Sequence, residues 1–228
     1  MLDLGQYRAV IFDWDGTLVD STDWVLGAHN HVRTTMGLSL WTKEDIFGCS
    51  SLSTRELYPK IYGENSQKAI ELIADYTSKY NLDGAIPYEH AEELLKLFSS
   101  LNKQLGVVSN KRHEPLNEMI DHMKWREYFV STIGAGRAER DKPHAAPLLM
   151  AMEIIDQDLV PADVLYVGDT ETDLMTAQNT GCPVVFIQSE KPRPDLIEKY
   201  KPDYVFENLK SFADAVIEHG LTANKKAI

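Results

Sequence analysis

Short, largely apolar runs recur along the chain, each four or five residues long and rich in Val and Ile. Runs of this length and composition are typical of strands that are buried on both faces, as in a parallel sheet. We therefore predict five strands, at residues 9–12, 105–108, 129–133, 164–167 and 184–187.

Between the later runs, apolar residues recur at spacings of three and four, which is typical of amphipathic helices. This spacing predicts helices at residues 92–101, 115–123, 146–155 and 172–180. Gly181 follows the last of them in the position favoured just past a helix end. Alternation of strands and helices indicates an α/β fold, a Rossmann-like, doubly wound parallel sheet with helices on both faces.

The segment 21–84 breaks this alternation, because it contains no convincing strand run. Apolar residues recur every four positions from Trp24 to Met36, and Ser66 is expected to cap a second helix that closes near Asn81 and Gly84. We therefore expect a core of residues 1–20 and 85–228 and an inserted helical cap of residues 21–84.

Charge and composition limit the classes of molecule that the protein is expected to bind. The chain has 23 Lys and Arg against 35 Asp and Glu, a net charge of −12, with no basic run of five or six residues. Such a surface repels nucleic acids and anionic membranes, so neither is an expected partner. Cys49 and Cys182 form no metal-binding pattern and are expected to be free thiols. Without a signal-like or membrane-spanning stretch, the expected location is the cytoplasm.

Polar residues follow the predicted strands at the edge where ligands bind in open parallel sheets. Each motif alone also fits a turn, a helix cap or a solvated lysine. Together they supply acids for a hard cation, oxygen-binding groups and a fixed positive charge, which suits phosphoryl transfer without a P-loop. The motifs are Asp13-Trp14-Asp15-Gly16-Thr17, Ser109-Asn110, Lys142-Pro143 and Gly168-Asp169 followed by Asp173.

These four motifs, in this order, resemble those of the haloacid dehalogenase superfamily. The closer resemblance is to its phosphoglycolate-phosphatase-like branch, which carries an α-helical cap after the first motif. The likeness extends over essentially the whole chain. Trp14 stands where Phe is usual, and its alternation with the two acids predicts that it packs in the core.

The resemblance implies a role for each acid. Asp13 would be the nucleophile that forms an aspartyl-phosphate, and Asp15 would protonate the leaving alkoxide and then deprotonate water. Mg²⁺ would be held by Asp13, the backbone carbonyl of Asp15 and Asp169, with Asp173 nearby.

The remaining motif residues would bind the phosphate. Lys142 would neutralise the nucleophile and the phosphate. Ser109 and the N–H groups of Gly16, Thr17 and Asn110 would contact phosphate oxygens.

The implied function is a Mg²⁺-dependent phosphatase acting on a small phosphorylated metabolite, with phosphoglycolate as the best single substrate. A carboxylic acid at Asp15 favours a reaction that protonates an alcohol. One alternative is a sugar phosphomutase of the same superfamily. Another is a non-catalytic binding protein that retains the fold.

Substrate contacts outside the motifs stay open. Arg55, in the cap loop 47–55, is a candidate for binding a substrate carboxylate, although it equally fits a surface arginine. The same loop holds Cys49. Further candidates near the site are His113, His144 and the pair Lys111 and Arg112. The oligomeric state is not predicted.

Overall fold

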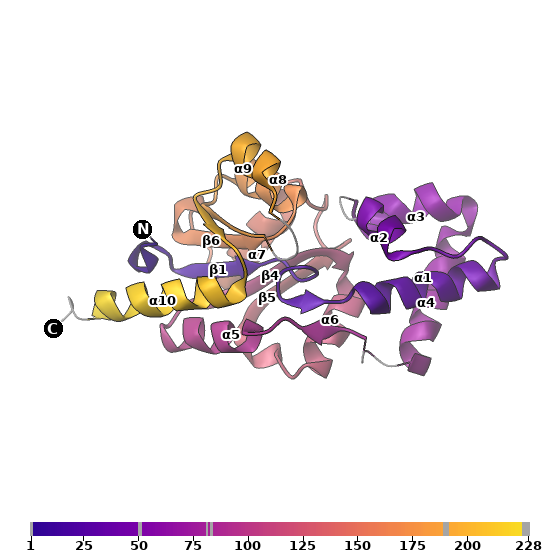
Figure 1. The fold of residues 1–228 in the computed structure, drawn as a ribbon, viewed down its shortest axis with the longest axis horizontal. Coiled ribbons are helices and arrows are strands. Elements are labelled where there is room, and N and C mark those ends of the chain that lie inside the picture. The colour runs from indigo at the N-terminus through magenta and orange to yellow at the C-terminus, as the bar shows by residue number, and fades with distance from the viewer. Residues whose placement is uncertain (1, 50–51, 81, 83, 189–191, 225–228) are drawn as a thin grey trace.

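The computed structural model describes residues 2–49, 52–80, 82, 84–188 and 192–224. Its centre is a six-stranded sheet in which every neighbouring pair of strands is parallel (Figure 1). From edge to edge, the strands are β5 (Phe129–Ala135), β4 (Gln104–Arg112), β1 (Ala9–Phe12), β6 (Val164–Gly168), β7 (Val184–Ile187) and β8 (Tyr204–Phe206). The predicted doubly wound parallel sheet is confirmed.

All five predicted strands are present, and β8 is an additional one. β4 continues beyond its apolar run as far as Arg112, and β5 continues as far as Ala135. Strand β8 has only three residues, none fully buried, at the edge of the sheet. The sequence gives little sign of it because an edge strand lacks the continuous burial that marks the inner strands.

Helices cover both faces of the sheet. Along β1, Val10 and Phe12 join the apolar cluster on one face, whereas Ala9 and Ile11 join the cluster on the other. Helices α5 (Ala91–Ser100), α6 (His113–His122) and α10 (Leu209–Asn224) contribute to the first cluster. Helices α7 (Ala146–Ile155), α8 (Glu171–Thr180) and α9 (Pro194–Tyr200) contribute to the second.

The four helices predicted between strands are α5 to α8, within two residues at each end. Gly181 follows α8 in the left-handed conformation with φ 83°, as expected. Single 3₁₀ turns lie at Leu4–Gln6, Gly63–Asn65, Arg126–Tyr128 and Pro161–Asp163.

Four further helices gather at one end of the molecule, to the right in Figure 1. They are α1 (Thr22–Thr35), α2 (Lys43–Cys49), α3 (Thr54–Tyr62) and α4 (Ser66–Tyr80). The chain enters this group through β2 (Val19–Asp20) and leaves it through β3 (Ile86–Pro87), and these two short strands pair antiparallel. The two connections therefore lie side by side.

One detail of this helical group corrects the sequence analysis. Ser66 does not cap α4 but is its first residue, with helical φ and ψ of −54° and −43°. The reason is that the preceding 3₁₀ turn already bends the chain, and the Ser66 hydroxyl donates back to the Gly63 carbonyl. Asn81, expected to close this helix, lies outside the described residues.

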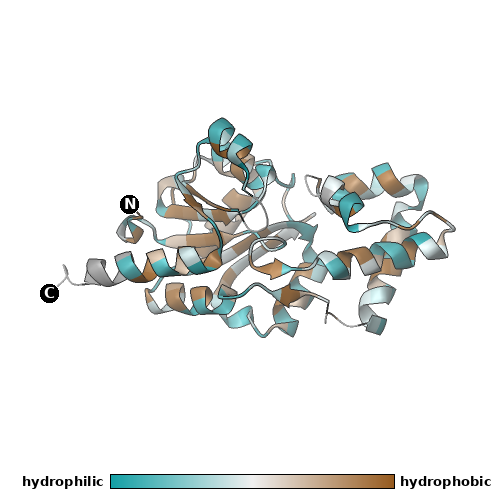
Figure 2. Cartoon of the chain, in the orientation of Figure 1, coloured by the Kyte–Doolittle hydropathy of each residue, from teal (hydrophilic) through white to brown (hydrophobic). Residues whose placement is uncertain are grey.

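Apolar residues lie on the strands and on the inward faces of the helices, and polar residues lie on the outer faces (Figure 2). Trp14 is fully buried, and its ring packs edge-on against that of Trp125 with the two ring centres 5.8 Å apart. This confirms its predicted place in the core. Cys49 and Cys182 are free, as predicted. Among the described helices, none combines the length and the apolar composition that crossing a bilayer requires.

Helices α1 and α3 meet around a buried histidine. The Nδ1 atom of His29 lies 2.7 Å from the Tyr62 hydroxyl, and the imidazole stacks on Trp41 at 4.8 Å. Burial, assisted by the charges of Arg33 and Lys111, lowers the pKa of His29 to about 4. The imidazole is therefore neutral at pH 7.

This shift makes stability depend on pH. Because the folded pKa lies below the unfolded value of about 6.5, the stabilisation is present above pH 6.5 and is lost as the pH falls towards 4. Between pH 7 and pH 5, we expect the wild type to lose about 2 kcal/mol more unfolding free energy than His29→Gln. Urea denaturation of both proteins at the two pH values measures this difference. Equal losses would contradict the assignment.

Strand β5 approaches the start of α6 so closely at Gly134 that this position requires a glycine. A Cβ there would lie 2.4 Å from the Cα atom of His113, where α6 begins. Gly134→Ala is therefore expected to lower the unfolding free energy by about 1–3 kcal/mol in urea denaturation. The matched control is Gly48→Ala in α2, where no described atom lies within 4 Å. That variant should be within about 1 kcal/mol of the wild type, and a similar loss in both would refute the steric explanation.

Candidate active site

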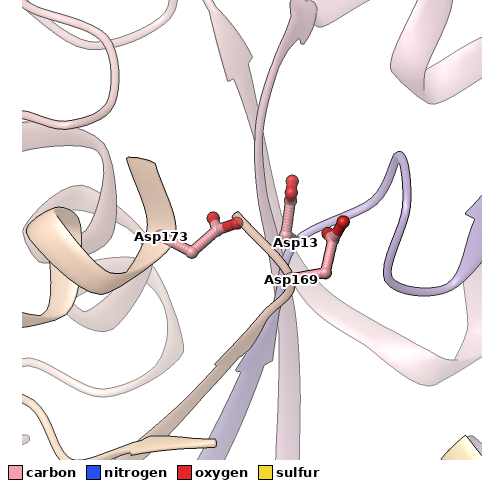
Figure 3. Close-up of side chains that lie close together, drawn as sticks. All are labelled: Asp13, Asp169 and Asp173. Atoms are coloured by element: carbon pink, nitrogen blue, oxygen red, sulfur yellow. The ribbon is translucent and has the colours of Figure 1, made fainter. Parts of the chain in front are cut away.

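Three carboxylates converge at the carboxyl ends of β1 and β6 (Figure 3). Asp13 follows β1, Asp169 follows β6, and Asp173 projects from the first turn of α8. One oxygen from each lies within 4.8 Å of the others, and Asp13 and Asp173 are buried. The strand-end acids predicted from the sequence are thus brought together in one site.

Local structure fixes Asp173. Thr170 caps α8, and its N–H and hydroxyl donate to Oδ2 of Asp173 at 3.0 Å and 2.6 Å. The N–H of Asp173 in turn approaches the Thr170 hydroxyl, which completes a capping box. Gly168 is required here, because a Cβ on it would lie 2.4 Å from the Cβ of Asp173.

Lys142 joins two of the acids. Its ammonium lies 2.8 Å from Oδ1 of Asp13 and 2.7 Å from Oδ1 of Asp173, and its side chain is only 2% exposed. The Tyr166 hydroxyl, from β6, donates to the same Asp173 oxygen at 2.8 Å. Sequence reasoning missed Tyr166, because within an apolar strand run it is indistinguishable from a core residue.

The acids outnumber the buried cation, and this shifts their protonation. Burial and the charge of Asp173 raise the pKa of Asp13 to about 7, although Lys142 acts in the opposite direction. Burial and the other acids also raise the pKa of Asp169. Burial raises the pKa of Asp173 too, but the charge of Lys142 and the bonds that Asp173 accepts outweigh it, so the net shift is downward.

This arrangement fits a divalent cation. Buried negative charge that is only partly compensated favours either protons or a metal ion. Carboxylate oxygens are the ligands that Mg²⁺ prefers, and it takes few of them from a protein. Asp13, Asp169 and Asp173 are therefore the residues that would hold such an ion.

Asp15 has different surroundings from the other acids. Its Oδ1 accepts a hydrogen bond from the Ser21 hydroxyl and lies 3.0 Å from the ammonium of Lys111. The Lys111 side chain is 7% exposed, and its ammonium lies 5.3 Å from the centre of the Trp24 ring. The sequence placed Lys111 near the site, but its pairing with Asp15 could not be read from a separation of 96 residues.

The Asp15–Val19 turn contains Gly16 and Thr17, whose contacts with phosphate stay a prediction. The Gly16 N–H donates to the Val19 carbonyl at 3.0 Å and the Thr17 N–H to the Trp14 carbonyl at 3.3 Å, so the turn itself uses these donors. Gly16 and Thr17 also lie against the side chain of Asp169. The Thr17 hydroxyl donates to Asp169 Oδ1 at 2.7 Å. Gly16 has φ 87°, and a Cβ on it would lie 2.3 Å from Asp169 Oδ2.

The residues after β4's apolar run also face the site. Ser109 and Asn110 line the same cavity as Asp13, Lys142 and Asp169. The Ser109 hydroxyl accepts the Lys111 N–H at 3.1 Å, and the Asn110 amide donates to the Lys142 carbonyl at 3.1 Å. The Asn110 side-chain oxygen is buried without a hydrogen-bond partner among the described residues.

The side chain of Arg55 does not lie with the motif residues at the strand ends. Its guanidinium donates to the carbonyls of Ala138 and Glu139 at 3.0 Å and 2.9 Å and pairs with Asp141 at 2.9 Å. These contacts tie α3 to the segment before Lys142, and Arg55 is not among the described lining of the cavity. A contact between Arg55 and substrate stays a prediction.

The other open candidates separate into two groups. Cys49 lines the cavity, whereas His113 and His144 do not belong to its described lining. His113 bonds with Asn117, and the ring of His144 accepts the Ala146 N–H at 3.1 Å. Ser50 and Ser51, from the same loop as Cys49, lie outside the described residues.

The cavity itself has a volume of about 1300 Å³. Its lining includes the carboxylates at the strand ends and side chains of the helical group α1–α4. The acids therefore stand at one wall of a space whose opposite wall is helical.

Two curated relatives are named pyrophosphatase PpaX. The protein from Bacillus mycoides is 24% identical over 202 residues, which covers 89% of this chain and 93% of the relative. The protein from Bacillus cereus strain B4264 is 26% identical over 206 residues, with the same two coverages of 89% and 93%.

Solved structures share the fold. A predicted phosphoglycolate phosphatase from Haemophilus somnus has a TM-score of 0.80 at 21% identity, covering 92% of this chain and 98% of its own. A haloacid dehalogenase-like hydrolase from Bacteroides fragilis has a TM-score of 0.78 at 20% identity, covering 89% and 98%.

The sequence model described as haloacid dehalogenase-like hydrolase matches residues 10–187. This range contains all four motifs and the whole helical group α1–α4. The chain therefore belongs to the haloacid dehalogenase-like hydrolase family, as its motifs predict.

Proposed function

We propose that this protein is a Mg²⁺-dependent phosphatase that hydrolyses a small phosphorylated metabolite through an aspartyl-phosphate. The observation that carries the proposal is the carboxylate of Asp13, held by Lys142 at 2.8 Å beside Asp169 and Asp173 on the wall of a large cavity. The family and the phosphatase names of the relatives support it.

Asp13 is the nucleophile in this proposal. Its Oδ1 accepts the Trp14 N–H at 2.7 Å and contacts the Lys142 ammonium, which fixes the plane of the carboxylate. We assign Oδ2 to attack phosphorus, so that a bond to phosphorus forms as the bond to the leaving oxygen breaks. Water then cleaves the acyl phosphate and restores the carboxylate.

Asp15 handles the protons. It donates one to the departing alkoxide and takes one from the attacking water, which leaves it unchanged after the cycle. The bond from Ser21 and the contact with Lys111 hold its carboxylate outside the group of three acids.

Charge on the phosphoryl group is balanced by residues around it. Lys142, the Ser109 hydroxyl and the backbone N–H of Asn110 are the groups we assign to the phosphoryl oxygens. Mg²⁺, held by Asp13, Asp169, Asp173 and the Asp15 carbonyl, would withdraw electron density from those oxygens.

We further propose that residues 21–84 act as a cap over a core of residues 1–20 and 85–228. The paired strands β2 and β3 place both connections at one point, which suits a segment that moves as a unit. Closure over the cavity would exclude water while the phosphoryl group is transferred.

The substrate is tested directly with a panel. Phosphoglycolate, predicted from the resemblance, and pyrophosphate, named in the relatives, belong on it beside neutral phosphate esters. Release of inorganic phosphate distinguishes hydrolysis from the transfer that a sugar phosphomutase performs. If no compound on the panel releases phosphate, activated aryl phosphates included, the proposed function is refuted.

Replacing the nucleophile tests the mechanism. Asp13→Asn keeps the shape of the side chain but removes the attacking carboxylate, so kcat should fall at least about 10³-fold. Phosphate release measures the loss, and thermal unfolding checks that the variant is folded. Asp214→Asn, at an exposed carboxylate of α10, is the matched control and should keep wild-type kcat. Turnover retained by Asp13→Asn would reject the assignment.

Metal removal tests the three acids. Chelation should abolish phosphate release, and added Mg²⁺ should restore it. Independently of activity, Mg²⁺ at about 100 times its Kd should stabilise the folded protein by about 2.7 kcal/mol, which thermal unfolding detects. Asp169→Asn should weaken that stabilisation, since it removes one of the carboxylates of the group. Stabilisation of equal size in both proteins would show that the ion binds elsewhere.

A further inference from the structure

The helical wall of the cavity has no formally charged side chain among the residues that the structure describes. The described residues of α1–α4 and their connections that line it include no Asp, Glu, Lys or Arg. Apolar and aromatic side chains form most of this wall, among them Trp24, Ala28, Trp41, Leu57, Tyr58 and Ile73. We call these six residues the apolar wall.

The one histidine on this side adds no positive charge. His29 is buried, and its Nδ1 atom is bonded to the Tyr62 hydroxyl at 2.7 Å. Its lowered pKa keeps the ring neutral at pH 7. A negatively charged group placed against the apolar wall therefore meets no cation among the described lining residues of α1–α4. The Lys111 ammonium over Trp24 is paired with Asp15, and Arg33, 4.9 Å from the centre of the Trp41 ring, lies outside the described lining.

On the opposite wall, the cations are paired. Each Lys or Arg in the described lining already has a carboxylate partner: Lys111 with Asp15, Arg112 with Glu114, Lys142 with Asp13 and Asp173, and Arg193 with Asp195. The described lining holds four such cations against seven Asp and Glu. Beyond the phosphoryl group, a further negative charge would thus be repelled.

The position of Asp15 connects the reaction to the apolar wall. The leaving oxygen must lie within reach of Asp15, which protonates it. Asp15 contacts Lys111 at 3.0 Å, and Lys111 lies over the ring of Trp24. The carbon skeleton of the leaving group would therefore start beside Trp24 and continue along the apolar wall.

We propose, building on the proposed phosphatase function, that the substrate is a phosphate monoester whose alcohol is uncharged and apolar, with an aromatic or bulky alkyl group. Burying such a group against the apolar wall is favourable in proportion to the apolar area removed from water. A carboxylate or a second phosphate at the same place would lose its hydration without gaining a partner. Phosphoglycolate and pyrophosphate are therefore poor substrates.

A matched pair of substrates tests this inference. Benzyl phosphate and 4-carboxybenzyl phosphate have the same shape near phosphorus and differ by one distant charge. We expect kcat/KM for benzyl phosphate to be at least about tenfold higher with the wild-type enzyme and Mg²⁺. Equal values, a preference for the carboxylate, or faster hydrolysis of phosphoglycolate or pyrophosphate would overturn the inference while leaving the phosphatase function intact. No hydrolysis of any ester would refute the phosphatase function instead.

A charge placed on the helical wall provides the second test. Ala74 lines the cavity but is an exposed residue of α4, so Ala74→Lys adds an ammonium without burying it. We expect KM for 4-carboxybenzyl phosphate to fall and the preference for benzyl phosphate to shrink about tenfold. Gln67→Lys adds the same charge on α4 outside the described lining and should leave the preference unchanged. An unchanged preference in Ala74→Lys, or equal shifts in both variants, would overturn the inference.

Discussion

The buried ammonium of Lys142 is the interaction on which the rest of the site depends. It contacts Asp13 and Asp173 in a space from which water is almost excluded. Burial alone would lower the pKa of Lys142, but the attraction of the two acids outweighs burial and raises it. Removing one partner of such a group leaves an uncompensated buried charge, at a cost of roughly 3–5 kcal/mol. The same contact therefore makes the fold sensitive to the loss of any of the three residues, and it fixes the candidate nucleophile.

The parallel topology makes this contact possible. β1 lies between β4 and β6, so the loops after these three strands emerge next to one another. Asp13 and Asp169 come from the loops after β1 and β6, and Ser109 comes from the last part of β4, although the three are distant in sequence. Lys142 arrives from the segment after β5, and Asp173 from the first turn of α8. Each side chain is thus fixed by a different element, and no single loop has to hold the whole site.

The sequence predicted the inner strands, the helices between them and the acids at the strand ends, because these depend on local pattern and on a general rule of parallel sheets. The sequence did not predict contacts between residues that are far apart along the chain. The pairing of Arg55 with Asp141 joins positions 86 residues apart, and nothing in the loop around Arg55 distinguishes it from a solvated arginine. The sequence did not show that the N–H groups of Gly16 and Thr17 close a turn, because a tight turn and a phosphate-binding loop have the same sequence pattern.

In this acidic protein, whose net charge is −12, charged and apolar residues line different sides of the cavity. The core side carries the charges, and in the proposed function its excess of acids would make the binding of an anionic phosphoryl group dependent on a cation. The helical side would then recognise the remainder of the substrate. In the substrate preference inferred above, the absence of charge among the described lining residues of the helical side limits which leaving groups that side accepts, while the charges at the strand ends act on the phosphoryl group.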